Sequence, residues 1–138
     1  MDGEEKIKIV RGDASYYPYE IMNADDTVSG LYFDIVDSIC CRLNLVVEVK
    51  SLPWKRAILM IKTGEADAIT CFGRSIEREE FAIYHENNIL SNSCFNFFTL
   101  KENSEKIIYS GNLNELAGYK ISLVMGYFYN NVFDDVDF

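Results

Sequence analysis

The chain has 138 residues, and its 22 Asp and Glu residues outnumber its 13 Lys and Arg residues, which gives a formal net charge of -9. Because a protein of this charge repels phosphates at a distance, a nucleic-acid partner is not expected. The sequence is 49% hydrophobic and 25% charged, which is typical of a packed domain and excludes a disordered or collagen-like chain.

The cysteines give no sign of a metal centre. The four of them, Cys40, Cys41, Cys71 and Cys94, form no C-x-x-C pair, and His85 is the single histidine. No metal site is therefore expected, and nothing in the sequence calls for a cofactor. Neighbouring side chains on a helix diverge, which disfavours a bond between Cys40 and Cys41. We expect free or mostly buried thiols, with a disulfide as the less favoured alternative.

The first 72 residues alternate between strand-like and helix-like patterns. Strands are predicted over Lys6 to Val10, over Val46 to Val49, and over the mostly apolar run Ala66 to Phe72. Apolar residues at helical spacing predict helices over Leu31 to Leu43 and from Pro53 to Gly64, where the glycine can take a left-handed cap. Strands that alternate with helices form right-handed crossovers, so we expect the α/β class, with a mainly parallel sheet flanked by helices.

The pattern changes after the third predicted strand. An aromatic run spans Cys94 to Leu100, and the polar and charged segment Lys101 to Lys106 is the best candidate for a linker. Beyond it, Leu113 to Leu116 predicts a short helix and Ile121 to Met125 predicts a further strand.

Candidate binding residues follow each of the three predicted strands. Because the carboxyl ends of parallel strands meet at one edge of a sheet, we expect their loops to share one groove. The loops supply an aspartate, aromatic rings, a glycine, a hydroxyl and an arginine, namely Asp13, Tyr16, Tyr17, Tyr19, Trp54, Gly73, Ser75 and Arg78. Rings that exclude water, a guanidinium for a carboxylate and an aspartate for an amine suit a small zwitterion. In the alternative interpretation, Tyr17 and Tyr19 pack beneath the loop, and Lys55 and Arg74 are solvated surface charges.

Five motifs, in this order, resemble those of the bacterial family 3 extracellular solute-binding proteins. They are Tyr16-Tyr17-Pro18-Tyr19-Glu20, Ser29-Gly30-Leu31-Tyr32-Phe33-Asp34-Ile35, Pro53-Trp54-Lys55-Arg56-Ala57, Gly64-Glu65-Ala66-Asp67-Ala68-Ile69 and Ser75-Ile76-Glu77-Arg78-Glu79. Members of this family are the periplasmic amino-acid receptors of ABC importers. The resemblance implies the first lobe of a type II periplasmic-binding-protein fold over residues 1–100, a hinge over 101–107 and the beginning of a truncated second lobe over 108–138.

The resemblance also assigns roles to the loop residues. It implies that Arg78 binds the α-carboxylate of the ligand with help from the Ser75 hydroxyl, and that Tyr16 and Trp54 enclose the ligand side chain. Asp13 lies where some members place a carboxylate for a cationic ligand. The turn Gly126-Tyr127-Phe128-Tyr129 departs from the family pattern, because it lacks a hydroxyl that helps to hold the ligand. With a second lobe this short, we expect millimolar or weaker binding.

The expected function is therefore that of a non-catalytic receptor for a small amino-acid-like solute, with the membrane permease of an ABC importer as its partner. We expect a periplasmic location, although the acidic start of the chain does not resemble a signal peptide. A homodimer through exposed or exchanged second-lobe elements is also expected. One alternative is a sensory module ahead of a membrane kinase or cyclase. Another is a dehydratase-like enzyme, but its acid–base candidates Glu20, Glu77 and His85 have no partner at a recognisable spacing.

Overall fold

A computed structural model of the chain describes residues 5–87, 91 and 94–134. The chain divides into two compact units, Met1–Leu90 and Ser91–Phe138, called unit 1 and unit 2 below, and each is described by itself. The predicted division into a lobe, a hinge and a second lobe stays a prediction. The elements of unit 1 are β1 (Lys6–Gly12), β2 (Ile21–Met22), β3 (Val28–Ser29), α1 (Leu31–Leu43), β4 (Val46–Leu52), α2 (Trp54–Lys62), β5 (Ala68–Ile69) and α3 (Ile76–Glu79).

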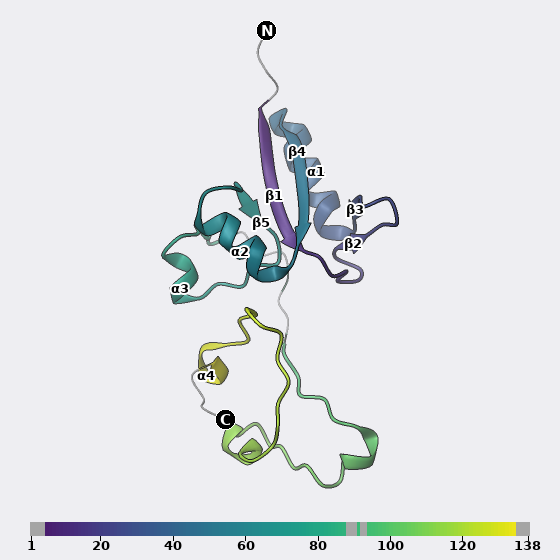
Figure 1. The fold of residues 1–138 in the computed structure, drawn as a ribbon, viewed down its shortest axis with the longest axis vertical. Coiled ribbons are helices and arrows are strands. Elements are labelled where there is room, and N and C mark those ends of the chain that lie inside the picture. The colour runs from purple at the N-terminus through teal and green to yellow at the C-terminus, as the bar shows by residue number, and fades with distance from the viewer. Residues whose placement is uncertain (1–4, 88–90, 92–93, 135–138) are drawn as a thin grey trace. The chain divides into compact units, whose positions relative to one another are not determined.

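The main sheet of unit 1 has the strand order β4-β1-β5, and both pairings are parallel. β1 pairs with β4 from Lys6 opposite Val46 to Gly12 opposite Leu52. The arrowheads of β1 and β4 therefore point to the same end of the sheet (Figure 1). The predicted α/β class with a parallel sheet is confirmed, while the small antiparallel pair β2–β3 was not predicted.

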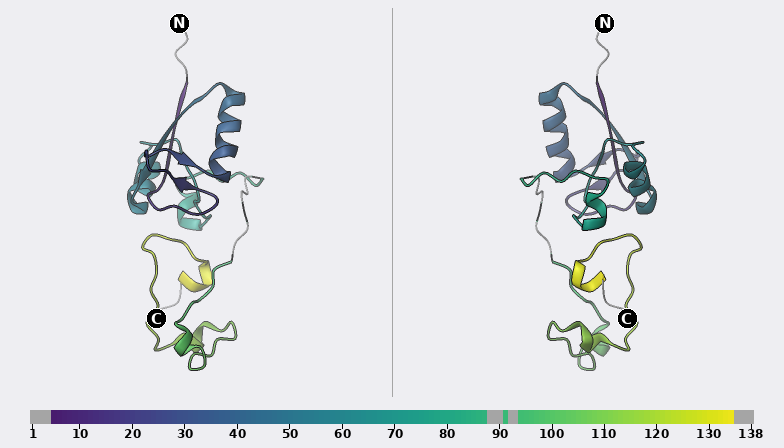
Figure 2. Two further views of the ribbon diagram at one scale, coloured as in Figure 1. Left: turned by 90° about the vertical axis from the view of Figure 1, so that its right-hand side faces the viewer. Right: turned by 90° about the vertical axis from the view of Figure 1, so that its left-hand side faces the viewer.

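The two longer helices cover different faces of the sheet. The chain passes from β1 through α1 to β4 at one edge, and then returns through α2 to β5 on the other side of β1. Right-handed crossovers in opposite directions place their helices on opposite faces. Figure 2 shows α1 and α2 on opposite sides of the strands.

The core of unit 1 lies between the central strand and α2. Val10 and Ala57 are 0% exposed, and Ala66 completes this buried cluster. Partly buried apolar side chains pack around it, namely Leu52, Met60, Ile61 and Ile69. This packing fixes the strands, and the loops that follow the strands at the carboxyl end of the sheet therefore start from fixed positions.

Most of the predicted elements of unit 1 form where expected. The helix predicted over Leu31 to Leu43 has these bounds in α1, and Gly64 follows α2 with a positive φ of 72°. The strand predicted over Ala66 to Phe72 is shorter, because only Ala68–Ile69 form β5. Cys71 adopts a φ of 53°, which turns the backbone out of the extended conformation.

Unit 2 contains short helical turns, η1 (Lys101–Asn103), η2 (Leu113–Leu116) and α4 (Asn131–Asp134). The short helix predicted at Leu113 to Leu116 is present as a 3₁₀ turn, but the strand predicted over Ile121 to Met125 is wrong. A strand requires a neighbour for its backbone hydrogen bonds, and the described part of unit 2 supplies none.

The four cysteines are free thiols, as expected. Cys40 is buried, whereas Cys41, Cys71 and Cys94 are exposed. Cys40 lies on the face of α1 that also buries Tyr32 and Phe33. The sequence pattern located this one face correctly but could not place cysteines in loops.

Candidate functional site

The first candidate region is a tight turn over residues 16–20, called the tyrosine turn below. Its backbone closes on itself, because Tyr16 N donates to Glu20 O at 2.7 Å and Tyr19 N donates to Tyr16 O at 2.8 Å. The Tyr16 and Tyr19 ring centroids are 5.0 Å apart, and Tyr19 stacks on Tyr32 at 4.9 Å. Tyr32 is 3% exposed and Tyr16 is 49% exposed, so the row of rings leads from the core of unit 1 to solvent.

The second candidate region is built around Phe72, which directly follows Cys71 in the segment after β5. The Arg78 guanidinium carbon lies 4.2 Å from the centroid of the Phe72 ring, and Arg78 Nη1 donates to Gly73 O at 2.8 Å. Ser75 caps α3, since its Oγ accepts a hydrogen bond from Arg78 N. Arg78 is only 7% exposed, so its charge is weakly screened by water.

Two of the further rings that contact Phe72 belong to the region that we call the Phe72 cluster (Trp54, Phe72, Gly73, Arg78 and Tyr84). Trp54 contacts Phe72 edge-on, with centroids 6.0 Å apart, and Tyr84 stacks on Phe72 at the same separation with an interplanar angle of 17°. Tyr84 Oη donates to Gly73 O at 3.2 Å. Burial raises the pKa of Tyr84 to about 12, so this hydroxyl stays a donor at neutral pH.

The predicted binding residues thus gather at the carboxyl edge of the sheet in two groups. Tyr16 and Tyr19 share the tyrosine turn, while Trp54, Gly73, Ser75 and Arg78 belong to the Phe72 cluster or adjoin it. Trp54 also lies over the end of β1, because a Cβ added to Gly12 would be 3.6 Å from its ring. Asp13 is exposed in the loop that follows. The roles of these residues in ligand binding stay predictions.

The alternative interpretation of the loop charges fits Lys55 and Arg74, which are both exposed. Arg74 pairs with Glu79 on the surface. Tyr17 is 69% exposed and does not pack beneath the loop, whereas Tyr19 is partly buried between its two ring neighbours.

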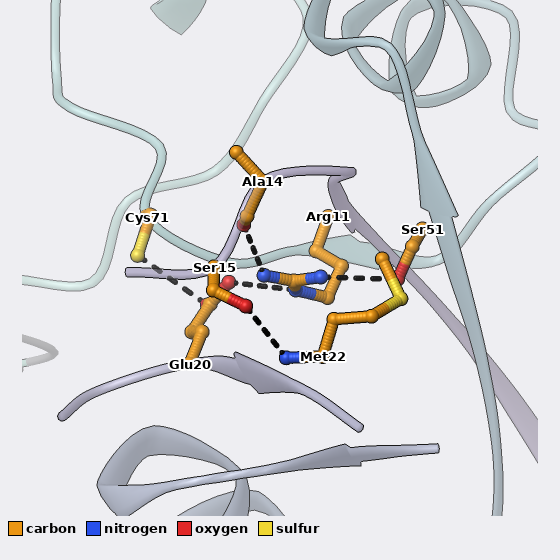
Figure 3. Close-up of polar contacts among 7 residues, drawn as sticks. All are labelled: Arg11, Ala14, Ser15, Glu20, Met22, Ser51 and Cys71. Atoms are coloured by element: carbon orange, nitrogen blue, oxygen red, sulfur yellow. Dashed lines mark hydrogen bonds and ion pairs between the residues drawn. The ribbon is translucent and has the colours of Figure 1, made fainter. Parts of the chain in front are cut away.

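The sequence reasoning missed Phe72, Tyr84 and Arg11. Phe72 could have been found, since it is the last residue of the third predicted strand and directly precedes the candidate loop that begins at Gly73. Arg11 follows the apolar residues Ile9 and Val10, and a charge at the end of a central strand is a signal for a buried partner. That partner is Glu20, whose Oε2 accepts from Arg11 Nε at 2.9 Å (Figure 3).

The acid–base candidates of the enzymatic alternative are not gathered at one place. Glu20 is 3% exposed and is held by Arg11, while Glu77 and His85 are exposed. The described residues also contain no group of histidine, cysteine, aspartate and glutamate side chains that could hold a metal ion. Their helices include none with the length and apolar character needed to cross a membrane.

A family model described as bacterial extracellular solute-binding proteins, family 3, matches residues 9–117. The chain belongs to this family. Residues 9–117 include every predicted binding residue, and they include both the tyrosine turn and the Phe72 cluster. Membership in the family places the chain among extracellular binding proteins whose fold is the type II periplasmic-binding-protein fold. The predicted family and fold are confirmed.

Several solved structures are similar to part of the chain. A periplasmic binding protein of Salmonella typhimurium with high arginine specificity is 18% identical, with a TM-score of 0.49, over 56% of this chain and 34% of that protein. The L-cystine solute receptor of Neisseria gonorrhoeae is 18% identical, with a TM-score of 0.48, over 57% of this chain and 34% of the receptor. An ABC-transporter binding component of Wolinella succinogenes, complexed with lysine, is 18% identical, with a TM-score of 0.49, over 55% of this chain and 33% of that protein.

The chain matches about a third of the length of these solved family members. A comparison with curated proteins gives no match. Family membership therefore rests on the match over residues 9–117, and the solute and the partners are matters for proposal.

Proposed function

We propose that the chain is part of the substrate-binding component of an ABC-type importer, located in the periplasm, and that it binds a small amino-acid-like solute through the carboxyl edge of the unit 1 sheet. Its partner in transport is then the membrane permease. The observation that carries the proposal is the placement of Arg78, which lies over the Phe72 ring while Nη1 bonds to the Gly73 carbonyl. Binding of the solute itself is non-catalytic in this proposal.

The chemistry of the Phe72 cluster supports a carboxylate-bearing ligand. A guanidinium can bind a carboxylate through two parallel hydrogen bonds, and this pairing is strong where water is scarce. Arg78 meets the second condition because it is 7% exposed. The Ser75 hydroxyl, next to the cluster, accepts a hydrogen bond from Arg78 N at 3.3 Å, and the Trp54 ring of the cluster contacts Phe72. The cluster thus offers a cation, a hydroxyl and an aromatic surface to one small molecule.

A titration of the chain with L-arginine, L-lysine, L-glutamine and L-cystine tests the proposal. Binding is followed by thermal shift and by the fluorescence of Trp54, the single tryptophan. We expect roughly millimolar affinity for at least one of the four, since groups from unit 1 alone order a ligand poorly. For L-arginine, the decarboxylated analogue agmatine should bind more weakly, because it lacks the carboxylate assigned to Arg78.

Arg78→Ala should abolish the amino-acid response, and Arg74→Ala is the matched control, since Arg74 is exposed and occupies the same loop. Equal binding by the parent chain and the Arg78→Ala variant would show that the carboxylate assignment is wrong. If L-arginine, L-lysine and L-glutamine at tens of millimolar and L-cystine at its solubility limit all leave the parent chain unshifted, an amino-acid-like solute is the wrong class.

We also propose that unit 2 mediates self-association between two copies of the chain. Large apolar side chains in unit 2 are exposed, with Phe98 at 90%, Ile108 at 78% and Met125 at 70%. Large apolar side chains that are exposed to water favour association when a second copy can cover them. Light scattering at high concentration should show a dimer that Phe98→Asp converts to monomer, while Thr99→Asp, at an exposed polar neighbour, should not. A monomeric parent chain would contradict the proposal.

A further inference from the structure

A buried ion pair lies beside the candidate binding residues, and neither of its members is among them. Arg11, at the end of β1, is 1% exposed, and Glu20, at the end of the tyrosine turn, is 3% exposed. Arg11 Nε donates to Glu20 Oε2 at 2.9 Å. Removing two charges from water carries a large penalty, and apolar side chains of similar size often stabilise a fold as well or better. A contribution to stability therefore does not explain why the chain buries this ion pair.

The pair joins four segments of unit 1 (Figure 3). Besides bonding to Glu20, Arg11 Nη1 donates to Ser51 Oγ in β4 at 3.1 Å, and Arg11 Nη2 donates to the carbonyl of Ala14 at 2.7 Å. The other oxygen of Glu20, Oε1, accepts from Cys71 Sγ at 3.3 Å. A planar guanidinium with fixed donor directions is suited to holding several acceptors in one geometry. We call these five residues the Arg11 network.

The tyrosine turn is held at both of its ends by this network. Ala14 precedes the turn and Glu20 closes it, so Tyr16 and Tyr19 lie between two points that are fixed by one guanidinium. The chain around the turn is held further, because Met22 N donates to Ser15 Oγ at 3.0 Å. The exposed rings of the turn are therefore presented on a backbone with little freedom to move.

The Phe72 cluster is attached to the same network on its other side. Cys71, which donates to Glu20, is the residue directly before Phe72, and Phe72 is the ring over which Arg78 lies. A shift of Cys71 would thus move the ring that orients the proposed carboxylate-binding arginine. The Arg11 network is a bonded route between the segments that carry Tyr16 and Arg78.

We propose that Arg11 and Glu20 are positioning residues for ligand binding, which hold the tyrosine turn and the Phe72 cluster in the spacing that one small solute requires. This inference rests on the proposed function, and it adds that binding depends on residues that do not touch the solute. A site gains affinity when its groups are held in place before the ligand arrives.

The double variant Arg11→Met/Glu20→Leu separates positioning from stability. It removes both buried charges and keeps the side-chain volume, so its melting temperature should stay close to that of the parent chain. Its affinity for the amino acid that shifts the parent most among L-arginine, L-lysine, L-glutamine and L-cystine should fall by about tenfold or more. The control is Glu48→Leu/Lys50→Met, which removes an exposed ion pair from β4 and should leave affinity unchanged. Unchanged affinity in a stable Arg11→Met/Glu20→Leu variant would overturn the proposal.

A second measurement needs no ligand. Hydrogen exchange detected by mass spectrometry compares the parent chain with Glu20→Gln, which removes the charge at nearly constant shape. Positioning predicts faster exchange in peptides covering residues 13–22 and 71–78, with no change in α2. Equal acceleration in α2, or no change anywhere, would overturn the proposal, even if the double variant fails to fold. If no amino acid binds the parent chain but the local acceleration is found, the proposed solute class fails while the Arg11 network keeps its positioning role.

Discussion

Units 1 and 2 are both rich in apolar residues, but among the described residues unit 1 encloses more of them, since unit 2 buries Leu116 and Phe133 and leaves most of its large apolar side chains exposed. In unit 1, Val10 and Ala57 are 0% exposed, whereas Phe98 and Ile108 of unit 2 are 90% and 78% exposed. The difference follows from backbone pairing. β1 has a hydrogen-bonded neighbour on each side, which satisfies its amides and carbonyls and permits burial, while the described residues of unit 2 form no strand. Apolar composition alone therefore does not produce a core.

The largest expected contrast between the units comes from two glycines with nearly equal φ values, 108° at Gly30 and 109° at Gly111. A side chain at either position is strained, by roughly 1–3 kcal/mol. At Gly30 a Cβ would also lie 2.6 Å from the Tyr19 carbonyl oxygen, whereas at Gly111 it would meet nothing within 4 Å. Gly30→Ala should therefore destabilise unit 1 by roughly 1–3 kcal/mol beyond the conformational strain, because the tyrosine turn must move.

Urea denaturation followed by Trp54 fluorescence measures this contrast in unit 1. The Gly30→Ala midpoint should fall clearly, and that of Gly111→Ala should stay near the parent value, since Gly111 belongs to unit 2. Equal shifts of the urea midpoint for the two variants would mean that the units unfold together, and they would contradict the expected difference between unit 1 and unit 2.

A smaller contrast comes from the same substitution in each unit. Val10→Ala removes two methyl groups from a fully buried side chain, which should lower the free energy of unfolding by about 2 kcal/mol. Val124 is 52% exposed, so Val124→Ala should change it by less than about 0.5 kcal/mol. Chemical denaturation gives both values, and a loss at Val124 as large as that at Val10 would reveal a core in unit 2.

The sequence was sufficient where one local pattern decided the structure. The apolar stripe of α1 and the alternation in β1 follow from spacing alone, and the loops after parallel strands must reach the same edge. For this reason Trp54 and Arg78 could be assigned to one region before their shared contact with Phe72 was known.

The sequence was insufficient where the outcome depended on a distant partner. Nothing near Ile121 to Met125 indicates whether a neighbouring strand exists, so the pattern predicted a strand that does not form. Similarly, the pairing of Arg11 with Glu20 depends on how the tyrosine turn folds back over β1, and no residue spacing encodes that approach. Long-range pairing is thus the part of the site that periodicity could not predict.

The smallest expected effect concerns the thiol of Cys71, which reports on the Arg11 network of unit 1. Although the Cys71 residue as a whole is exposed, partial desolvation of its thiol raises the pKa of Cys71 to about 12, and the charge of Glu20 and the hydrogen bond to it act in the same direction. In the unfolded chain a thiol ionises near ~8.5. The stability contributed by the protonated thiol is therefore complete below that pH and is lost as the pH rises toward 12.

Glu20→Gln should lower the Cys71 pKa, since it removes the carboxylate while burial remains, and each unit of decrease gives about a tenfold larger thiolate fraction. The measurement is the rate of iodoacetamide alkylation against pH in a Cys41→Ser/Cys94→Ser background. The control is the alkylation rate of Cys94 of unit 2, measured in the chain that keeps all of its cysteines. Cys94 is exposed and distant in sequence from Glu20, so its rate should not respond to Glu20→Gln. An unchanged Cys71 rate would mean that the Glu20 carboxylate does not affect the pKa of the thiol. The hydrogen bond from Cys71 Sγ to Glu20 Oε1, which links the tyrosine turn to the Phe72 cluster, would then lack support.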